Sequence, residues 1–341
     1  RLITKLDNYK ALSASSTEQL WKDADRWMSF LETSARLYKY SFKDQVMIHA
    51  QRPNAVACAE YDTWGREDIA NRFVKRGSKG IALIDDSKDR TRLRYVFDFA
   101  DTNARDERSK EPFFWKITDE NETLVTNSLN QRFGTQSDSI DTAITELAHK
   151  LAKENGKDYL SQIETEGTFL EELDDFNVQV EFEGLLEKSV AYSLLSRCGF
   201  DTEAYLDKDD FTKLFDFNGI PAITALGTAV SELSEQALRT IERTLKDFER
   251  SKNYERNDIT QNNNGERDRV SARRGNADIS PEPLGNGERT ATTGQIRTNE
   301  EEISQGEQEH NVSGNASRRD VGRTPDGNRQ DGEGQTGQNA S

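Results

Sequence analysis

The chain has 341 residues, a net charge of −16, a hydrophobic content of 33% and a mean hydropathy of −0.89. No apolar run approaches the roughly 20 residues needed to cross a bilayer, and the two distant cysteines, Cys58 and Cys198, exclude a disulfide-rich secreted scaffold. We therefore expect a cytoplasmic protein without a membrane partner, part of which is too polar to fold.

The charge is distributed unevenly along the chain. Residues 1–100 carry 18 Lys and Arg against 14 Asp and Glu, whereas residues 101–250 carry 16 against 32. Residues 251–341 carry 12 against 16. The first hundred residues are therefore a basic island in an acidic chain, an asymmetry that points to a nucleic-acid partner for this part.

The N-terminal third begins with helical patterns. Residues 15–18 (SSTE) have the spacing of a capping box and predict a helix start, and the apolar residues behind them recur at helical spacing as far as Tyr38. A shorter helix is expected over residues 43–51, and Pro53 ends it.

Strand patterns follow. Residues 55–61 predict a strand, and residues 72–75 and 80–84 predict a hairpin-like pair around Gly77-Ser78. Alternating apolar residues predict another strand over 93–99, and residues 113–117 (FFWKI) predict a last short one. A helix followed by a small antiparallel sheet with a basic hairpin makes this part α+β.

Helical spacing dominates from about residue 139 onwards. It predicts helices over residues 140–154, 160–173, 178–198, 209–215 and 231–250. We therefore expect an α+β DNA-binding domain over residues 1–137 and an acidic helical subdomain over 138–250. After residue 250 the chain holds 12 of its 22 glycines and no Phe or Trp, which predicts a long disordered C-terminal tail over 251–341.

Motifs of common enzymes are absent from the sequence. The three histidines are scattered without the His-Glu-x-x-His spacing of a zinc site, and no glycine cluster matches the P-loop. The carboxylates between Asp207 and Asn218 do not fit a calcium-binding EF-hand loop. We expect no catalytic residues, no metal and no cofactor, and a chain that is not itself an enzyme.

Aromatic and amide side chains lie among the basic residues of the first hundred positions. Cationic groups that follow a phosphate backbone, with aromatic faces for bases to stack on, are typical of single-strand binders. A plain solvated turn is the alternative interpretation of the glycine-rich basic segment. We expect Tyr38 to belong to the core and Phe73 to point inward. The predicted DNA-binding residues are Tyr40, Phe42, Gln45, Gln51, Arg52, Asn54, Trp64, Arg72, Lys75, Arg76, Gly77, Lys79 and Gly80.

Several of these segments together resemble a known family. They are Tyr40-Ser41-Phe42-x-x-Gln45, Gln51-x-Pro53-x-Ala55, Tyr61-x-x-Trp64 and Val74-Lys75-x-Gly77-x-Lys79-Gly80-Ile81. They resemble the N-terminal single-stranded-DNA-binding domain of ArdC-type antirestriction proteins. The variant that the chain is most similar to stands at the head of large helicase/methyltransferase-like proteins of integrative conjugative elements of Gram-positive bacteria. The segment 96–102 and helical stretches over 189–200 and 217–245 extend the likeness to about residues 8–250.

This resemblance implies that residues 74–81 contact DNA phosphates and that Trp64 and Arg72 flank the strand. It implies a DNA-binding module of a mobile genetic element, associated with conjugation or antirestriction, as the N-terminal part of a larger protein. Its partners would be single-stranded DNA, duplex DNA in second place, and other conjugation or restriction proteins. ArdC proteins also carry a metalloprotease-like domain with a His-Glu-x-x-His site, which this chain lacks, so peptidase, helicase and methylase activities are not carried over.

Three other interpretations stay open. An acidic protein-binding antirestriction factor, or DNA mimic, would use the negatively charged region instead of the basic one. A non-catalytic remnant of a metalloprotease-containing antirestriction protein, or a protein whose catalytic half lies outside this chain, would show the same motifs. An interaction scaffold would use the basic segment only as a solvated turn.

Overall fold

The computed structural model describes residues 4–87 and 89–274, and it begins with two helices where the sequence predicted one. Helix α1 (Lys5–Gln19) starts at Thr4, which forms a capping box with Asp7, and α2 (Ala24–Arg36) is capped by Asp23. The predicted start at Ser15 was wrong because Ser15 lies inside α1, where its hydroxyl donates to the Leu12 carbonyl oxygen.

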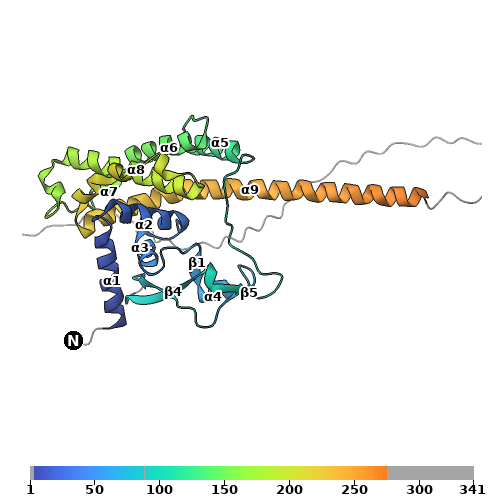
Figure 1. The fold of residues 1–341 in the computed structure, drawn as a ribbon, viewed down its shortest axis with the longest axis horizontal. Coiled ribbons are helices and arrows are strands. Elements are labelled where there is room, and N and C mark those ends of the chain that lie inside the picture. The colour runs from blue at the N-terminus through green and yellow to red at the C-terminus, as the bar shows by residue number, and fades with distance from the viewer. Residues whose placement is uncertain (1–3, 88, 275–341) are drawn as a thin grey trace, which may run out of the picture. The chain divides into compact units, whose positions relative to one another are not determined.

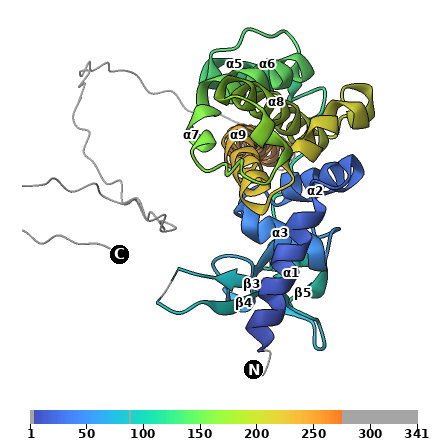
Figure 2. The ribbon, with the colours of Figure 1, turned by 90° about the vertical axis from the view of Figure 1, so that its left-hand side faces the viewer.

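A three-stranded antiparallel sheet follows α3 (Phe42–Gln51), the short helix that the sequence predicted. Its strand order is β1 (Cys58–Glu60), β4 (Arg92–Asp98) and β3 (Ile81–Asp85). A small core of Met47, Ile48, Leu83 and Val96 joins α3 to this sheet. Figure 2 shows α1 in front of β3 and β4, which agrees with the contacts between α1 and β3.

The predicted hairpin around Gly77-Ser78 was wrong, because its two strands belong to different sheets. Strand β2 (Arg72–Val74) pairs with β5 (Thr102–Ala104), which follows the 3-10 helix η1 (Phe99–Asp101). Strand β3 pairs with β4 instead. Residues 61–65 form a helix, α4 (Tyr61–Gly65), and residues 113–117 form no strand. The basic segment therefore connects two sheets.

The second half of the unit is helical, as predicted, although several boundaries differ. Helix α6 (Ile140–Asn155) and α8 (Asp175–Cys198) match their predictions, while α5 (Glu122–Phe133) was missed. The predicted helix over 160–173 was wrong: only α7 (Lys157–Leu160) and the 3-10 helix η2 (Phe169–Glu172) form there. Two more 3-10 helices follow α8, η3 (Thr202–Ala204) and η4 (Lys208–Phe217).

Helix α9 (Ile220–Arg274) runs through the centre of this helical part and packs against α5 and α8 (Figure 1). Residues 251–274 are helical, whereas the sequence predicted disorder from residue 251 onwards. The rest of the predicted tail, 275–341, lies outside the described residues. No helix in the described part of the chain is long and apolar enough to cross a membrane.

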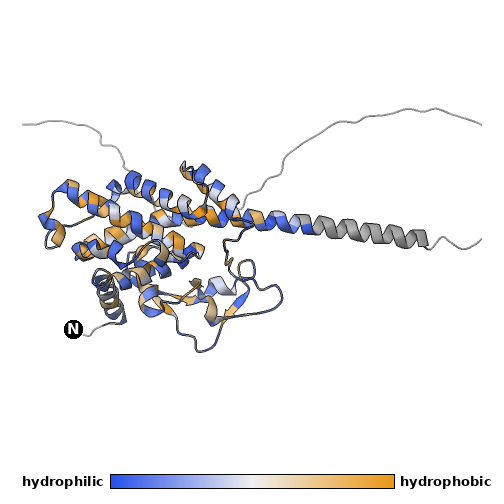
Figure 3. Ribbon diagram, turned by 45° about the horizontal axis from the view of Figure 1, so that its top comes forward, coloured by the Kyte–Doolittle hydropathy of each residue, from blue (hydrophilic) through white to orange (hydrophobic). Residues whose placement is uncertain are grey.

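One large apolar core connects α2 and α3 to the helical part, whose helices carry many of the apolar residues coloured in Figure 3. Trp27 of α2 is fully buried and donates its indole N–H to the Ser189 hydroxyl of α8 over 3.0 Å. Phe42 of α3 lies against α9 at Gly227, where any Cβ would overlap the Phe42 ring. These contacts hold α2 and α3, and with them the small sheet, against α8 and α9. The expected α+β class is confirmed, whereas the domain boundary near residue 137 stays a prediction.

Candidate nucleic-acid interface

A short basic loop joins β2 to β3, and its cations are the exposed ones among the predicted site residues. Lys75, Arg76 and Lys79 are all exposed. The Lys75 ammonium donates to the Ala100 carbonyl oxygen over 2.8 Å. Within the described residues none of the three forms an ion pair with a carboxylate. Their positive charge is therefore available to a ligand.

The backbone of this loop is fixed at both ends. The Lys75 N–H donates to the Asp101 carbonyl oxygen over 2.8 Å, which extends the pairing of β2 with β5 by one residue. The Ser78 N–H donates back to the Lys75 carbonyl oxygen. Gly77 adopts φ +87°, a backbone conformation that is unfavourable for residues with a Cβ atom. The turn is thus closed by a local hydrogen bond, whereas the strands at its two ends belong to separate sheets.

Arg72 has a structural position at the start of the same strand. Only 7% of the residue is exposed, and its guanidinium lies over the Phe99 ring at 4.5 Å. Its Nε also donates to the Thr102 hydroxyl over 2.8 Å across the β2–β5 pair. Arg72 therefore stabilises the two-stranded sheet that carries the loop, and its charge is mostly shielded from solvent.

Phe73 was expected to point inward, and this was wrong. It is 42% exposed, because the inward position of β2 is taken by Arg72 and the side chains of adjacent strand residues point to opposite faces. An exposed ring beside three free cations is the combination that binds an unpaired base next to its phosphate. Phe73 thus belongs to the candidate interface although the sequence prediction did not include it.

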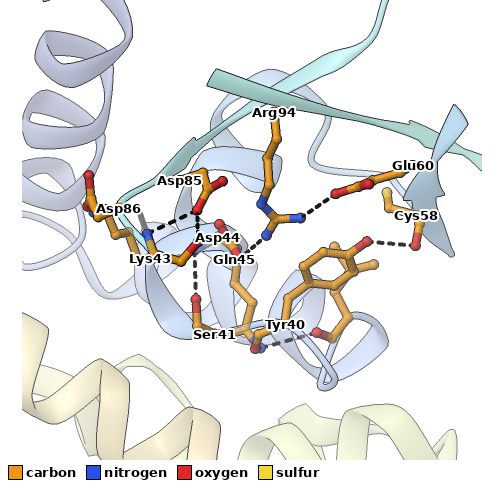
Figure 4. A network of polar contacts seen from close by, with 12 residues as sticks. Tyr40, Ser41, Lys43, Asp44, Gln45, Cys58, Glu60, Asp85, Asp86 and Arg94 are labelled. Atoms are coloured by element: carbon orange, nitrogen blue, oxygen red, sulfur yellow. Dashed lines mark hydrogen bonds and ion pairs between the residues drawn. The ribbon is translucent and has the colours of Figure 1, made fainter. Parts of the chain in front are cut away.

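Other cations of the basic island are neutralised within the protein. Arg52 pairs with Asp101, and Arg66 pairs with Asp68. Arg94 pairs with Asp44 at 2.6 Å and with Glu60 at 3.6 Å, as Figure 4 shows. Part of the positive charge that the sequence concentrates in this region is therefore neutralised within the protein, whereas the three cations of the β2–β3 loop are not, among the described residues.

The network around Arg94 joins α3 to the sheet (Figure 4). Burial raises the pKa of the Asp44 carboxyl, and the neighbouring Arg94 opposes that shift. Burial likewise raises the pKa of Tyr40, whose hydroxyl donates to the Cys58 carbonyl oxygen over 2.7 Å. Tyr40 is therefore held by its hydroxyl and does not lie free on the surface.

Three further predicted site residues have structural contacts. The Phe42 ring packs edge-on against Phe30 inside the core. Gln45 is 1% exposed and donates to the carbonyl oxygens of Leu37 and Tyr40. In this fold Phe42 and Gln45 do not reach a ligand on the surface. Asn54, by contrast, is exposed.

Gln51 connects α3 to the edge of the three-stranded sheet. Its side-chain amide donates to the Ala82 carbonyl oxygen over 2.8 Å, and its oxygen accepts the Ala82 N–H over 3.0 Å. The free edge of β3 is in this way paired by a side chain instead of a strand. Gln51 therefore stabilises the start of β3, to which the basic loop leads through Gly80.

A cavity of about 300 Å³ reaches Ile69 and Ala70, just before β2, and was not predicted from the sequence. Its walls come from the end of α2, from residues near β1 and α4, from residues 110–114, and from α8 and α9. Two predicted site residues, Tyr40 and Trp64, line it. Trp64 is 4% exposed and donates its indole N–H to the Phe97 carbonyl oxygen over 2.9 Å, so it contributes a fixed wall.

Comparison with known proteins gives little beyond the resemblance of motifs. No family model matches the chain, and no curated protein matches it. Among solved structures, the metal-free crystal structure of the antirestriction protein ArdC from plasmid R388 is similar over 61% of this chain and 86% of that chain, with 13% identity and a TM-score of 0.30. A likeness at this level carries no argument about function, and the described residues contain no cluster of three or more His, Cys, Asp or Glu suited to a metal.

Proposed function

We propose that this chain is a non-catalytic module that binds single-stranded DNA through the β2–β3 loop, as part of a mobile genetic element's conjugation or antirestriction machinery. The observation that carries the proposal is the free charge of Lys75, Arg76 and Lys79 beside the exposed Phe73 ring. The assignment to mobile elements, and to the head of a longer helicase/methylase-like protein, rests on the motif resemblance alone.

The loop suits a flexible strand better than a duplex. Its three cations lie in a stretch of five residues around a tight turn. They therefore contact a short length of nucleic-acid backbone and do not span the width of a duplex groove. An unpaired strand also offers base faces to Phe73, whereas stacked bases in a duplex do not. The acidic helical part would repel the second strand of a duplex, since residues 101–250 carry twice as many acidic as basic side chains.

The test is a fluorescence-anisotropy titration with a single-stranded and a double-stranded oligonucleotide of the same sequence. Wild-type protein is expected to bind the single strand more tightly, and the triple variant Lys75→Ala/Arg76→Ala/Lys79→Ala is expected to lose at least tenfold in affinity. A matched control is Lys22→Ala/Lys208→Ala/Arg239→Ala, which removes three exposed but ion-paired cations. Equal affinity of both triple variants would overturn the assignment of the loop.

A second candidate function is favoured by one feature of the helical part. Phe169 of η2 and Phe215 of η4 stack with ring centroids 5.3 Å apart, yet they are 50% and 53% exposed. Residues 164–181 around the first ring carry seven acidic side chains and no Lys or Arg. An acidic surface with exposed rings suits a basic protein partner, as expected for a protein-binding antirestriction factor. This function predicts inhibition of a restriction endonuclease that Phe169→Ala/Phe215→Ala removes and the loop variant does not.

A further inference from the structure

The cavity that reaches Ile69 and Ala70 has mostly apolar walls, and two exposed aromatic rings are among its lining residues. Phe113 and Phe114 line it and are 37% and 43% exposed, while Trp64, which also lines it, is buried. Its volume of about 300 Å³ lies at the lower end of the range of small-molecule sites. A ligand with one flat ring fits walls of this kind.

Two arginines in the walls have no carboxylate partner among the described residues. Arg197 of α8 donates to the Trp115 carbonyl oxygen over 3.2 Å, and its guanidinium lies 3.5 Å from the centre of the Trp115 ring. Arg36 of α2 donates to the carbonyl oxygens of Ala55 and Pro53. Burial lowers the pKa of both guanidinium groups. A partly desolvated cation whose direct hydrogen-bond partners are all neutral is stabilised when an anion reaches it.

The residues that line the cavity carry an excess of positive charge, which favours an anionic ligand. Four cationic residues, Arg36, Lys39, Lys110 and Arg197, line the cavity against two acidic ones, Glu111 and Glu242. Glu242 accepts from Lys39 over 2.7 Å and from Lys246 over 2.9 Å, so that Arg36, Lys110 and Arg197 remain against Glu111. This excess of positive charge occurs in a chain whose net charge is −16.

A row of rings leads from the cavity towards the basic loop. Phe114 meets Phe99 edge-on at 5.4 Å, and Phe99 in turn lies under the Arg72 guanidinium. Arg72 is three residues from Lys75 along an extended strand, a separation of at most about 11 Å. A strand held by the loop could therefore place a neighbouring nucleotide at the mouth of the cavity.

We propose that the cavity binds one nucleoside monophosphate unit, with its base against Phe113 and Phe114 and its phosphate facing the guanidinium groups of Arg197 and Arg36. The proposal rests on the proposed function only for the source of that unit, which would be an unstacked nucleotide of the bound strand. A free nucleotide has the same chemistry, so the experiment separates the two sources.

The experiment is an isothermal titration of the full chain with thymidine monophosphate, with thymidine and with inorganic phosphate. Thymidine monophosphate is expected to bind at one site, more tightly than either fragment. Phe114→Ala is expected to weaken it about tenfold, because one stacking face is lost. Arg197→Gln is expected to remove the preference for thymidine monophosphate over thymidine. The control Phe176→Ala removes an exposed ring of α8 and is expected to bind like wild type.

Absence of heat with thymidine monophosphate, or unchanged affinity in the Phe114→Ala protein, would overturn the proposal. Phe114 is exposed enough for its removal to leave the fold intact, so this variant keeps the test decisive even if Arg197→Gln unfolds the protein. The melting temperature of each variant identifies that case.

Competition with a ten-nucleotide thymidine strand distinguishes a nucleotide of the bound strand from a free nucleotide as the ligand of the cavity. If the strand displaces thymidine monophosphate, and does so only weakly in the Lys75→Ala/Arg76→Ala/Lys79→Ala protein, the unit belongs to the strand. If the nucleotide binds but the strand neither binds nor competes, the cavity is a free-nucleotide site and the proposed function fails. If the strand binds equally well to wild type and Phe114→Ala while the nucleotide does not bind, the cavity proposal fails and the proposed function stands.

Discussion

Two groups of basic residues in the N-terminal hundred positions have opposite surroundings in the structure. In the β2–β3 loop, Lys75, Arg76 and Lys79 face solvent without a carboxylate partner. In the layer between α3 and the sheet, Arg52 and Arg94 form ion pairs with acidic side chains. Residue types that look equivalent in the sequence are thus divided into a group free to bind a ligand and a group that stabilises the fold.

The division follows from where each segment packs. Strand β4 lies between two other strands and faces α3, so a charge on its inner face, such as that of Arg94, requires a partner such as Asp44. The loop lies outside both sheets, where a cation is solvated and needs no partner. We therefore expect variants of the ion-paired arginines to lower stability and variants of the loop cations to lower affinity.

The largest expected effect concerns a buried ring of the packing layer. Phe42→Ala should lower the free energy of unfolding by about 3–5 kcal/mol, because the ring is buried between Phe30 and the α9 backbone at Gly227. Chemical denaturation measures this effect. DNA affinity per folded molecule should not change, and a loss of affinity at unchanged stability would place Phe42 in the interface after all.

The next effect concerns acid stability. Burial would raise the pKa of Glu242, but hydrogen bonds from Lys39, Lys246 and Tyr38 outweigh it and lower the pKa from 4.5 to about 2. Because the folded state holds the carboxylate ionised, its contribution is present above pH 4.5 and is lost as the pH falls towards 2. The expected loss is about 3 kcal/mol at most.

Denaturation between pH 6 and pH 2.5 checks this contribution, with Glu242→Gln as the comparison. The variant should be less stable than wild type at pH 6, and the difference should shrink as the pH falls. If the difference in stability between wild type and Glu242→Gln stays constant with pH, the ion pairs of Glu242 are not its cause.

A smaller effect is expected at the exposed ring beside the loop. Phe73→Ala should reduce the affinity for single-stranded DNA by about 1 kcal/mol, or roughly fivefold, because one base loses its stacking partner. Stability should change little, since the ring is 42% exposed. Anisotropy titration of Phe73→Ala beside Phe176→Ala measures the difference, and equal affinities would remove Phe73 from the interface.

The smallest effect concerns the turn itself. Gly77→Ala should cost about 1 kcal/mol of stability, because the residue adopts φ +87° while its surroundings leave space for a methyl group. The cost should therefore come from the backbone and not from a clash. Thermal unfolding measures it, and a variant as stable as wild type would mean that the turn relaxes without strain.

Long periodic patterns made part of this fold predictable. Helices α6 and α8 were found from their apolar spacing alone, and the strand β4 from its alternation. The break between α1 and α2 was missed because apolar residues continue across it, and only Asp23 marks the new start. The pairing of β2 with β5 was missed because about 30 residues separate the strands, whereas Gly77-Ser78 suggested a local hairpin.

The candidate site shows the same limit. The loop could be predicted because its charge and its glycines are contiguous in the sequence. Burial of Phe42 and Trp64 depends on distant segments, so their pattern could not be told from that of a ligand-binding ring. The cavity is formed by residues as far apart as Arg36, Lys110, Arg197 and Glu242, and no local signal could have indicated it.

The salt dependence of single-stranded-DNA affinity tests the central claim most directly. Each phosphate neutralised by a cation contributes about 0.7 to the slope of the logarithm of affinity against the logarithm of salt concentration. The slope for wild type should therefore be steeper by about 2 than that for Lys75→Ala/Arg76→Ala/Lys79→Ala, while Lys22→Ala/Lys208→Ala/Arg239→Ala keeps the wild-type slope. Identical slopes for wild type and the loop variant would contradict the account.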